Sequence, residues 1–342
     1  MKKIFVMAAM VLGVSAAYAG DSEPLKAITK SKTYAEAEAL LNSTLDQLAS
    51  PQEKAKAYNK LYELSMKDFE TVSAVIAENQ RAAVMKTEQQ AYDTAAYYNS
   101  AYNAVKAAVE CDKYDGQPDA KGKTKIAYRK DETRLQKLTQ ARLELVNGGQ
   151  WIDGKNDEAG LLKYWGLFLE SRNTPLFESL PKEPFLGQVA FYAGAYAERA
   201  NKLDKANQYF DIAMQDPEWA EKAENAKFEV AGKNLKTEAD TLRYIGQLKD
   251  LYTQKNSEAA FSVLCKLYSS SNKTAELNAL VEDMLKKNPT NFLALAYHTQ
   301  SIADAVSRQE ENQNWDPAIE AYKKLLDASD KNQAFVYAGL GQ

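Results

Sequence analysis

The chain contains very little of what most catalytic sites are built from: one histidine and two cysteines among 342 residues. A serine or cysteine hydrolase would need His298 as its general base, but this residue lies in Phe292 to Thr299, a stretch with the apolar pattern of an ordinary helix. No G-x-S-x-G nucleophile elbow occurs in the chain. One histidine and two distant thiols cannot complete a tetrahedral metal shell. We therefore predict a protein that is not an enzyme and that has no catalytic residues, no metal site and no cofactor.

Glycine and proline are also scarce, with 15 and 9 residues, and no stretch alternates apolar and polar residues for long enough to indicate a strand. Alanine, leucine, lysine and glutamate are abundant, and they favour helices. The two cysteines, Cys111 and Cys265, are far apart in the sequence. In an extended array of repeats such distant residues do not meet, so we interpret them as small buried thiols and not as a disulfide.

The N-terminus has the pattern of a cleaved signal peptide. Lys2 and Lys3 precede an apolar run from Ile4 to Val14, and Ala17-Tyr18-Ala19 supplies a small-residue cleavage site before Gly20. The run is about half the ~20 residues needed to span a bilayer, and no second apolar run follows. We therefore expect residues 1–19 to be a signal peptide, and the mature chain to be periplasmic or secreted without stable membrane insertion.

Charge excludes one class of partner. The full chain has a formal net charge of −4, and loss of the two N-terminal lysines makes the mature chain more acidic still. Proteins that bind nucleic acid gain most of their affinity by neutralising phosphates. We expect no nucleic-acid partner.

The N-terminal part, residues 20–111, is predicted to be helical. Residues 20–33 are expected to form a short tail before a helix that opens near Thr33, and Ser50-Pro51-Gln52-Glu53 is a capping box with proline at the first helical position. Residues 112–125 form a long polar interruption that predicts an exposed loop, and residues 126–342 continue as helix pairs.

Two patterns in that loop resemble ligand-binding motifs. Gly116 to Thr124 almost spells a phosphate-binding loop, but it has one residue too many between the glycines and follows a helical run instead of a strand. Asp112, Asp115 and Asp119 offer oxygens to calcium without the spacing of a calcium loop. A flexible, solvated linker is the preferred interpretation of both patterns.

The stretch from Gly194 to Pro217 predicts one helix-turn-helix unit. Gly194 permits a close helix crossing, a polar turn follows, and Ala206, Phe210 and Ala213 form the inner stripe of the second helix. Gly160 and Tyr164 follow Gly148 at the same offsets as Ala206 and Phe210 follow Gly194, and a third unit starts at Cys265 and closes at Asn288-Pro289. We expect the signature aromatic residues to be used in packing between helices: Trp151, Tyr164, Phe210, Tyr268 and Tyr322.

This register resembles the tetratricopeptide repeat (TPR). The resemblance implies an all-α, right-handed α-solenoid of TPR-like helix-turn-helix repeats, whose first helices line a concave groove that holds a protein or peptide partner. Carried over by register, the partner-binding groove would be lined by Gln188, Phe191, Ala195, Glu198 and Arg199 in one repeat and by Ser262, Lys266 and Ser269 in another.

The sequence thus favours an exported TPR-like scaffold that mediates protein–protein interactions in the cell envelope. An alternative is a glycan-handling accessory protein that stacks sugars on exposed members of its 20 tyrosines and 4 tryptophans. An enzyme with paired carboxylates is a third possibility, although the spacing of the 47 acidic residues selects no pair.

Overall fold

The computed structural model describes residues 20–155, 157–233, 235, 237–309 and 313–328. Over these ranges the chain forms fourteen α-helices and one short 3-10 helix, with no strand. This confirms the predicted all-α solenoid of helical repeats. The predicted signal peptide, residues 1–19, and the last predicted helix, which begins near Ala334, lie outside the described residues. The chain divides into two compact units, one ending at Glu183 and the other beginning at Pro184. This boundary lies inside the segment predicted as one block of repeats.

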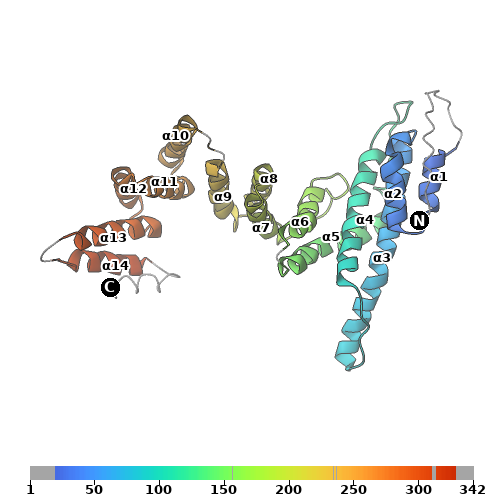
Figure 1. Cartoon of the computed structure of the whole chain (residues 1–342), viewed down its shortest axis with the longest axis horizontal. Coiled ribbons are helices and arrows are strands. Elements are labelled where there is room, and N and C mark those ends of the chain that lie inside the picture. Colours follow the sequence, from blue (N-terminus) through green and yellow to red (C-terminus); the bar gives the residue numbers. More distant parts are fainter. Residues whose placement is uncertain (1–19, 156, 234, 236, 310–312, 329–342) are drawn as a thin grey trace, which may run out of the picture. The chain divides into compact units, whose positions relative to one another are not determined.

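In the first unit, α3 packs along α4, α4 packs against α5, and α5 pairs with α6 (Figure 1). The two short N-terminal helices pack on each other and on α3. The helices of this unit are α1 (Glu23–Lys30), α2 (Tyr34–Thr44), the 3-10 helix η1 (Leu45–Gln47), α3 (Pro51–Met85), α4 (Thr94–Asp115), α5 (Glu132–Asp153) and α6 (Glu158–Arg172).

Local capping signals placed two helix starts correctly. The Thr33 hydroxyl accepts from the backbone N–H of Glu36 at the start of α2, and the Ser50 hydroxyl accepts from that of Glu53 at the start of α3. The predicted N-terminal tail is wrong, because it contains α1. The buried Glu53 carboxylate accepts from the backbone N–H and the hydroxyl of Ser22, both at 2.7 Å, and this contact ties the start of α1 to α3.

The predicted exposed loop at residues 112–125 begins too early. Helix α4 continues to Asp115, and Asp112 and Asp115 are buried. Asp112 forms a two-point ion pair with Arg129, and Asp115 accepts from the backbone N–H groups of Ala127 and Tyr128. A buried carboxylate needs such partners, and they come from sequence positions that a local reading does not connect.

In the remaining part of that loop, the Asp119 side chain binds backbone N–H groups of the same loop. Asp119 Oδ1 accepts from the backbone N–H groups of Lys121 and Lys123 at 2.9 Å, and the Asp119 carbonyl accepts from Gly122. Amides that a phosphate-binding loop would offer to its ligand are therefore occupied by a carboxylate. This geometry supports the interpretation of the segment as a turn.

In the second unit each helix packs on its neighbour in sequence, except that α9 packs on α11 instead of on α10. They are α7 (Leu186–Arg199), α8 (Leu203–Ala213), α9 (Ala220–Lys233), α10 (Glu238–Lys255), α11 (Glu258–Ser270), α12 (Thr274–Lys287), α13 (Phe292–Ser307) and α14 (Asp316–Asp327). Thr237 caps α10 as predicted. Asp316, predicted as the cap of α14, is instead its first residue, preceded by Trp315 without a side-chain cap.

Packing within the helix pairs follows the predicted register. In the α7–α8 pair Gly194 faces the fully buried ring of Phe210, and in the α5–α6 pair Gly148 faces the ring of Tyr164. Tyr268 is buried as well, and Trp151 contacts the ring of Tyr98. The prediction that signature aromatics serve in packing is confirmed at these positions.

Both cysteines are free and buried, as predicted. Cys111 lies in the first unit, and Cys265 lies in the second, within an apolar cluster formed by α10, α11 and α12. His298 is half-buried on α13.

Candidate functional site

The eight residues predicted to line a groove lie on two helices of the second unit. Gln188, Phe191, Ala195, Glu198 and Arg199 belong to α7, whereas Ser262, Lys266 and Ser269 belong to α11. Half of them are exposed: Gln188, Arg199, Lys266 and Ser269. The other four are half-buried.

Helix α9 lies between these two sets, because it contacts both α7 and α11. Lys233 on α9 forms an ion pair with Glu198 at 2.8 Å, and Glu229 on the same helix pairs with Lys266. The Glu198 side chain is only 12% exposed. Ion pairs thus link Glu198 of α7 and Lys266 of α11 to the helix between them. The surface of α7, α9 and α11 that carries the predicted residues is called the first-helix face. Two of its charges are neutralised by these ion pairs.

Phe191 packs against other aromatic rings of the second unit. Its ring centroid lies 5.9 Å from that of Phe210 and 5.2 Å from that of Trp219, and it also contacts Tyr192. Such distances are those of packed aromatic pairs. Phe191 therefore belongs to an aromatic cluster that holds α7, α8 and the start of α9 together, and Tyr192 is its exposed member.

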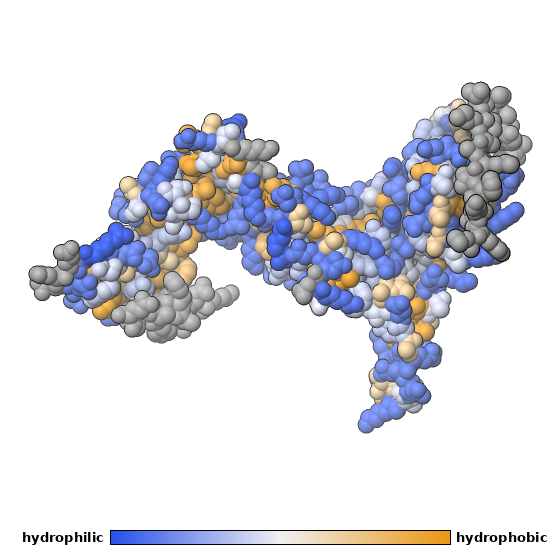
Figure 2. All heavy atoms as spheres, viewed as in Figure 1, coloured by the Kyte–Doolittle hydropathy of each residue, from blue (hydrophilic) through white to orange (hydrophobic). Residues whose placement is uncertain are grey.

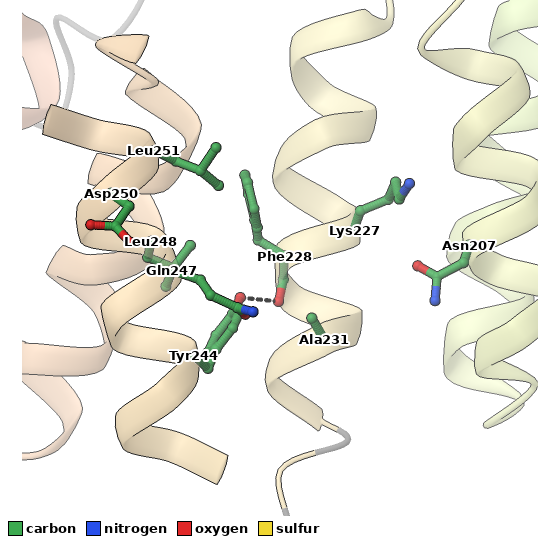
Figure 3. A pocket seen from close by; sticks show the side chains of 9 residues that line it. All are labelled: Asn207, Lys227, Phe228, Ala231, Tyr244, Gln247, Leu248, Asp250 and Leu251. Atoms are coloured by element: carbon green, nitrogen blue, oxygen red, sulfur yellow. Dashed lines mark hydrogen bonds between the residues drawn. The ribbon is translucent and has the colours of Figure 1, made fainter. Parts of the chain in front are cut away.

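A cleft of about 760 Å³ opens between α8, α9 and α10 (Figure 3). Its walls are apolar and its rim carries amides and charges of both signs. The lining residues are Asn207 from α8, Lys227, Phe228 and Ala231 from α9, and Tyr244, Gln247, Leu248, Asp250 and Leu251 from α10. Figure 2 shows apolar side chains at the surface in this part of the unit, where most of the visible surface is hydrophilic.

The cleft exists because α9 and α10 do not pack as a tight pair. Helix α10 packs on α11, whereas α9 packs on α8 and α11. One hydrogen bond crosses between the two helices: the Tyr244 hydroxyl donates to the carbonyl of Phe228 (Figure 3). Burial raises the pKa of Tyr244 to about 12, so the phenol stays protonated and able to donate at neutral pH.

None of the eight predicted groove residues lines this cleft. At about 100° per residue, Glu229 and Lys233 share one side of α9, whereas Lys227 and Ala231 lie on the opposite side. The cleft and the first-helix face are therefore two separate surfaces of the same unit. No sequence pattern indicates the cleft, because its lining residues have the same apolar spacing as a closed helix pair.

Two further properties of the described residues bear on the site. No helix among them combines the length and apolarity that crossing a bilayer would take. Within the same residues no group of three or more His, Cys, Asp or Glu side chains is arranged to hold a metal ion.

Comparison with known proteins adds little. No family model and no curated protein matches the chain. Among solved structures, the TPR domain of P58(IPK) aligns with 12% sequence identity over 90% of each chain, with a TM-score of 0.23. The candidate surfaces are therefore defined by the contacts of this chain alone.

Proposed function

We propose that this protein is an exported scaffold that binds a segment of a protein partner in the cleft between α9 and α10. The observation that carries the proposal is the separation of these two helices, which leaves apolar side chains beside open space. In the α7–α8 pair, by contrast, the two helices bury their apolar side chains against each other. Phe228, Ala231 and Leu251 are only half-buried there. A segment that covered them would gain the free energy of removing apolar surface from water.

The chemistry of the lining favours a peptide segment over a reacting substrate. The nine lining residues include no histidine, cysteine or serine, so the cleft contains no imidazole base and no serine or cysteine nucleophile. Asp250 places a carboxylate at the rim, whereas Lys227 forms an ion pair with Asp211. Asn207 and Gln247 add amides that can pair with a peptide backbone. An amphipathic helix laid into an apolar groove uses this combination of apolar floor and polar rim.

The first-helix face is the proposed second contact area. Arg199 and Lys266 are exposed on it, and Gln188 and Ser269 add polar groups. A partner that extended beyond the cleft could reach this face around α9. Rim charges of this kind influence association rate and specificity more than affinity.

The glycan alternative gains no support from the exposed aromatic residues. In the described part of the chain these are Tyr92, Tyr192 and Trp315, and they belong to three different segments. Exposed rings on separate segments do not form the continuous stacking surface that a sugar chain requires. A protein partner therefore remains the function we propose, with export through residues 1–19 as part of it.

Site-specific photocrosslinking in cells tests the cleft. A photoreactive residue at Gln247, exposed on the cleft rim, should give a discrete crosslinked product, and one at exposed Lys286 on α12 serves as the control. A product from position 247 that is absent from position 286 supports the proposal. Equal products from both positions, or none from position 247, would contradict it.

A further inference from the structure

The first unit contains two buried arginines in very different surroundings. Arg142, 1% exposed, donates to the Ser171 hydroxyl at 3.0 Å and to the Phe168 carbonyl at 2.8 Å, and it forms an ion pair with Glu183. Its charge is thus compensated and its guanidinium is well satisfied, as a buried cation requires.

Arg134, 6% exposed, lacks this compensation. Within the described part of the chain no carboxylate forms an ion pair with its guanidinium. Nη1 donates to the Asn59 side chain, and the guanidinium carbon lies 4.0 Å from the centroid of the Tyr62 ring and 5.3 Å from that of Tyr128. Nε is buried without a hydrogen-bond partner. Rings and an amide orient this guanidinium, but they do not neutralise it.

The neighbouring thiol does not supply the missing negative charge. Burial raises the pKa of Cys111 to about 12, although the positive charge of Arg134 opposes this shift. Cys111 is therefore a neutral thiol at physiological pH, and a thiol is a weak hydrogen-bond acceptor.

A pocket of about 270 Å³ opens beside Arg134 at the start of α5. Its lining combines two cations, two carboxylates and two aromatic rings: Arg134 and Lys137, Glu63 and Asp131, and Tyr62 and Tyr128, together with Asn59, Ala127 and Thr133. The volume is somewhat below the range of about 300–1,000 Å³ that holds drug-sized ligands. A small ligand therefore fits.

The charges of the lining select among small anions. A guanidinium pairs well with carboxylate and with phosphate. Glu63 and Asp131 are both exposed at this pocket and would repel a doubly charged phosphate, whereas they could accept hydrogen bonds from an ammonium group. We propose that this pocket binds a small zwitterion of the α-amino acid class, with its carboxylate on Arg134 and its ammonium group toward Glu63 and Asp131.

Thermal unfolding of the mature chain, residues 20–342, tests this with defined probes. Each of the common L-amino acids is added singly, along with the dipeptide glycyl-phenylalanine, phenylalaninamide, acetate and inorganic phosphate. We expect at least one amino acid to raise the melting temperature, and phenylalaninamide, which lacks the carboxylate, to give no rise. A larger rise with the dipeptide than with any free amino acid would overturn the amino-acid assignment and indicate the carboxylate of a peptide terminus. A rise with phosphate alone, or with no probe, would overturn the proposal.

Three variants separate binding from folding. Arg134→Met should abolish the ligand-induced rise, and Arg129→Met is its control, because Arg129 pairs with Asp112 and does not line the pocket. Without ligand, Arg134→Met should leave the melting temperature unchanged or raise it, since a buried charge without a counter-ion is removed, whereas Arg129→Met should lower it.

If Arg134→Met does not fold, Glu63→Gln is the alternative variant, because Glu63 is exposed. It should weaken amino-acid binding about tenfold and leave acetate binding unchanged. A rise that persists in Arg134→Met, or amino-acid binding unaffected by Glu63→Gln, would contradict the assignment.

Discussion

A Cβ atom placed on Gly194 would lie 2.5 Å from Cε1 of Phe210, closer than real Cβ contacts come. Glycine at this position is therefore what allows α7 and α8 to cross at the observed distance. Gly148 and Tyr164 have the same separation in sequence and the same relationship in the α5–α6 pair, where the nearest ring atoms are 3.2 Å away. The close approach of a glycine on one helix to a ring on the next is thus a repeated feature of the fold.

Replacing Gly194 by leucine should lower the free energy of unfolding by about 1–3 kcal/mol or more, because the larger side chain must displace the buried Phe210 ring. Urea unfolding monitored by circular dichroism measures the change. Gly246 is the control, because a Cβ there meets nothing within 4 Å, and Gly246→Ala should stabilise α10 by roughly 0.5–1 kcal/mol. If Gly194→Ala raised the free energy of unfolding as much as Gly246→Ala does, the crossing of α7 and α8 would not be close.

Alkaline pH should lower the free energy of unfolding of the second unit, partly through ionisation of Cys265 in the unfolded state. Burial raises the pKa of this thiol from 9.0 to about 12, so it stays neutral in the folded state while it ionises in the unfolded state. Its contribution to stability is fully present below pH 9 and is lost as the pH rises from 9 to 12, by at most about 1.4 kcal/mol per pH unit. Cys265→Ala should therefore show a shallower decline than the parent chain over this range, in urea titrations at several pH values. Parallel declines would mean that the thiol is not shielded.

Export should leave a mature chain that begins at Gly20, because Ala17-Tyr18-Ala19 supplies the processing site. N-terminal sequencing of protein recovered from cells, with fractionation of the cell envelope, measures this. Intact Met1 in the membrane pellet would instead indicate an uncleaved anchor.

Sequence reasoning succeeded where the signals are local or follow a fixed register. Thr33, Ser50 and Thr237 cap helices because the side chain and the backbone N–H that it binds are three residues apart. The crossing of Gly194 with Phe210 was predicted because a repeat fixes their separation. The buried thiols could be predicted because a short apolar side chain suits a helix interface.

Non-local features were missed. The N-terminal helix α1 depends on Glu53, which lies 31 residues from Ser22, and the true end of α4 depends on Arg129 reaching back to Asp112. The cleft between α9 and α10 depends on α10 packing on α11 instead of on α9. No pattern within either helix encodes that choice. The uncompensated charge of Arg134 is likewise visible only once its neighbours in space are known.

Substitution of Phe191 is a poor test of partner binding, because the change would also affect stability. Truncating Phe191 should destabilise the unit by about 3 kcal/mol, because its ring packs against Phe210 and Trp219. Arg199→Glu is the cleaner probe, since Arg199 is exposed, and it should change the association rate with the partner without changing the helical circular-dichroism signal. An unchanged association rate in Arg199→Glu would remove the first-helix face from the proposed contact area.

The most direct test of the proposed binding surface compares one substitution at two sites. Ala231→Trp places an indole in the cleft between α9 and α10, whereas Ala195→Trp places the same group on α7, and both alanines are half-buried. The measurement is the Kd for the partner identified by crosslinking, determined by titration calorimetry for the parent chain and both variants. The proposal predicts at least a tenfold loss of affinity in Ala231→Trp and a smaller loss in Ala195→Trp, with helical content retained in both. Full affinity in Ala231→Trp together with loss in Ala195→Trp would contradict the cleft and assign binding to the first-helix face.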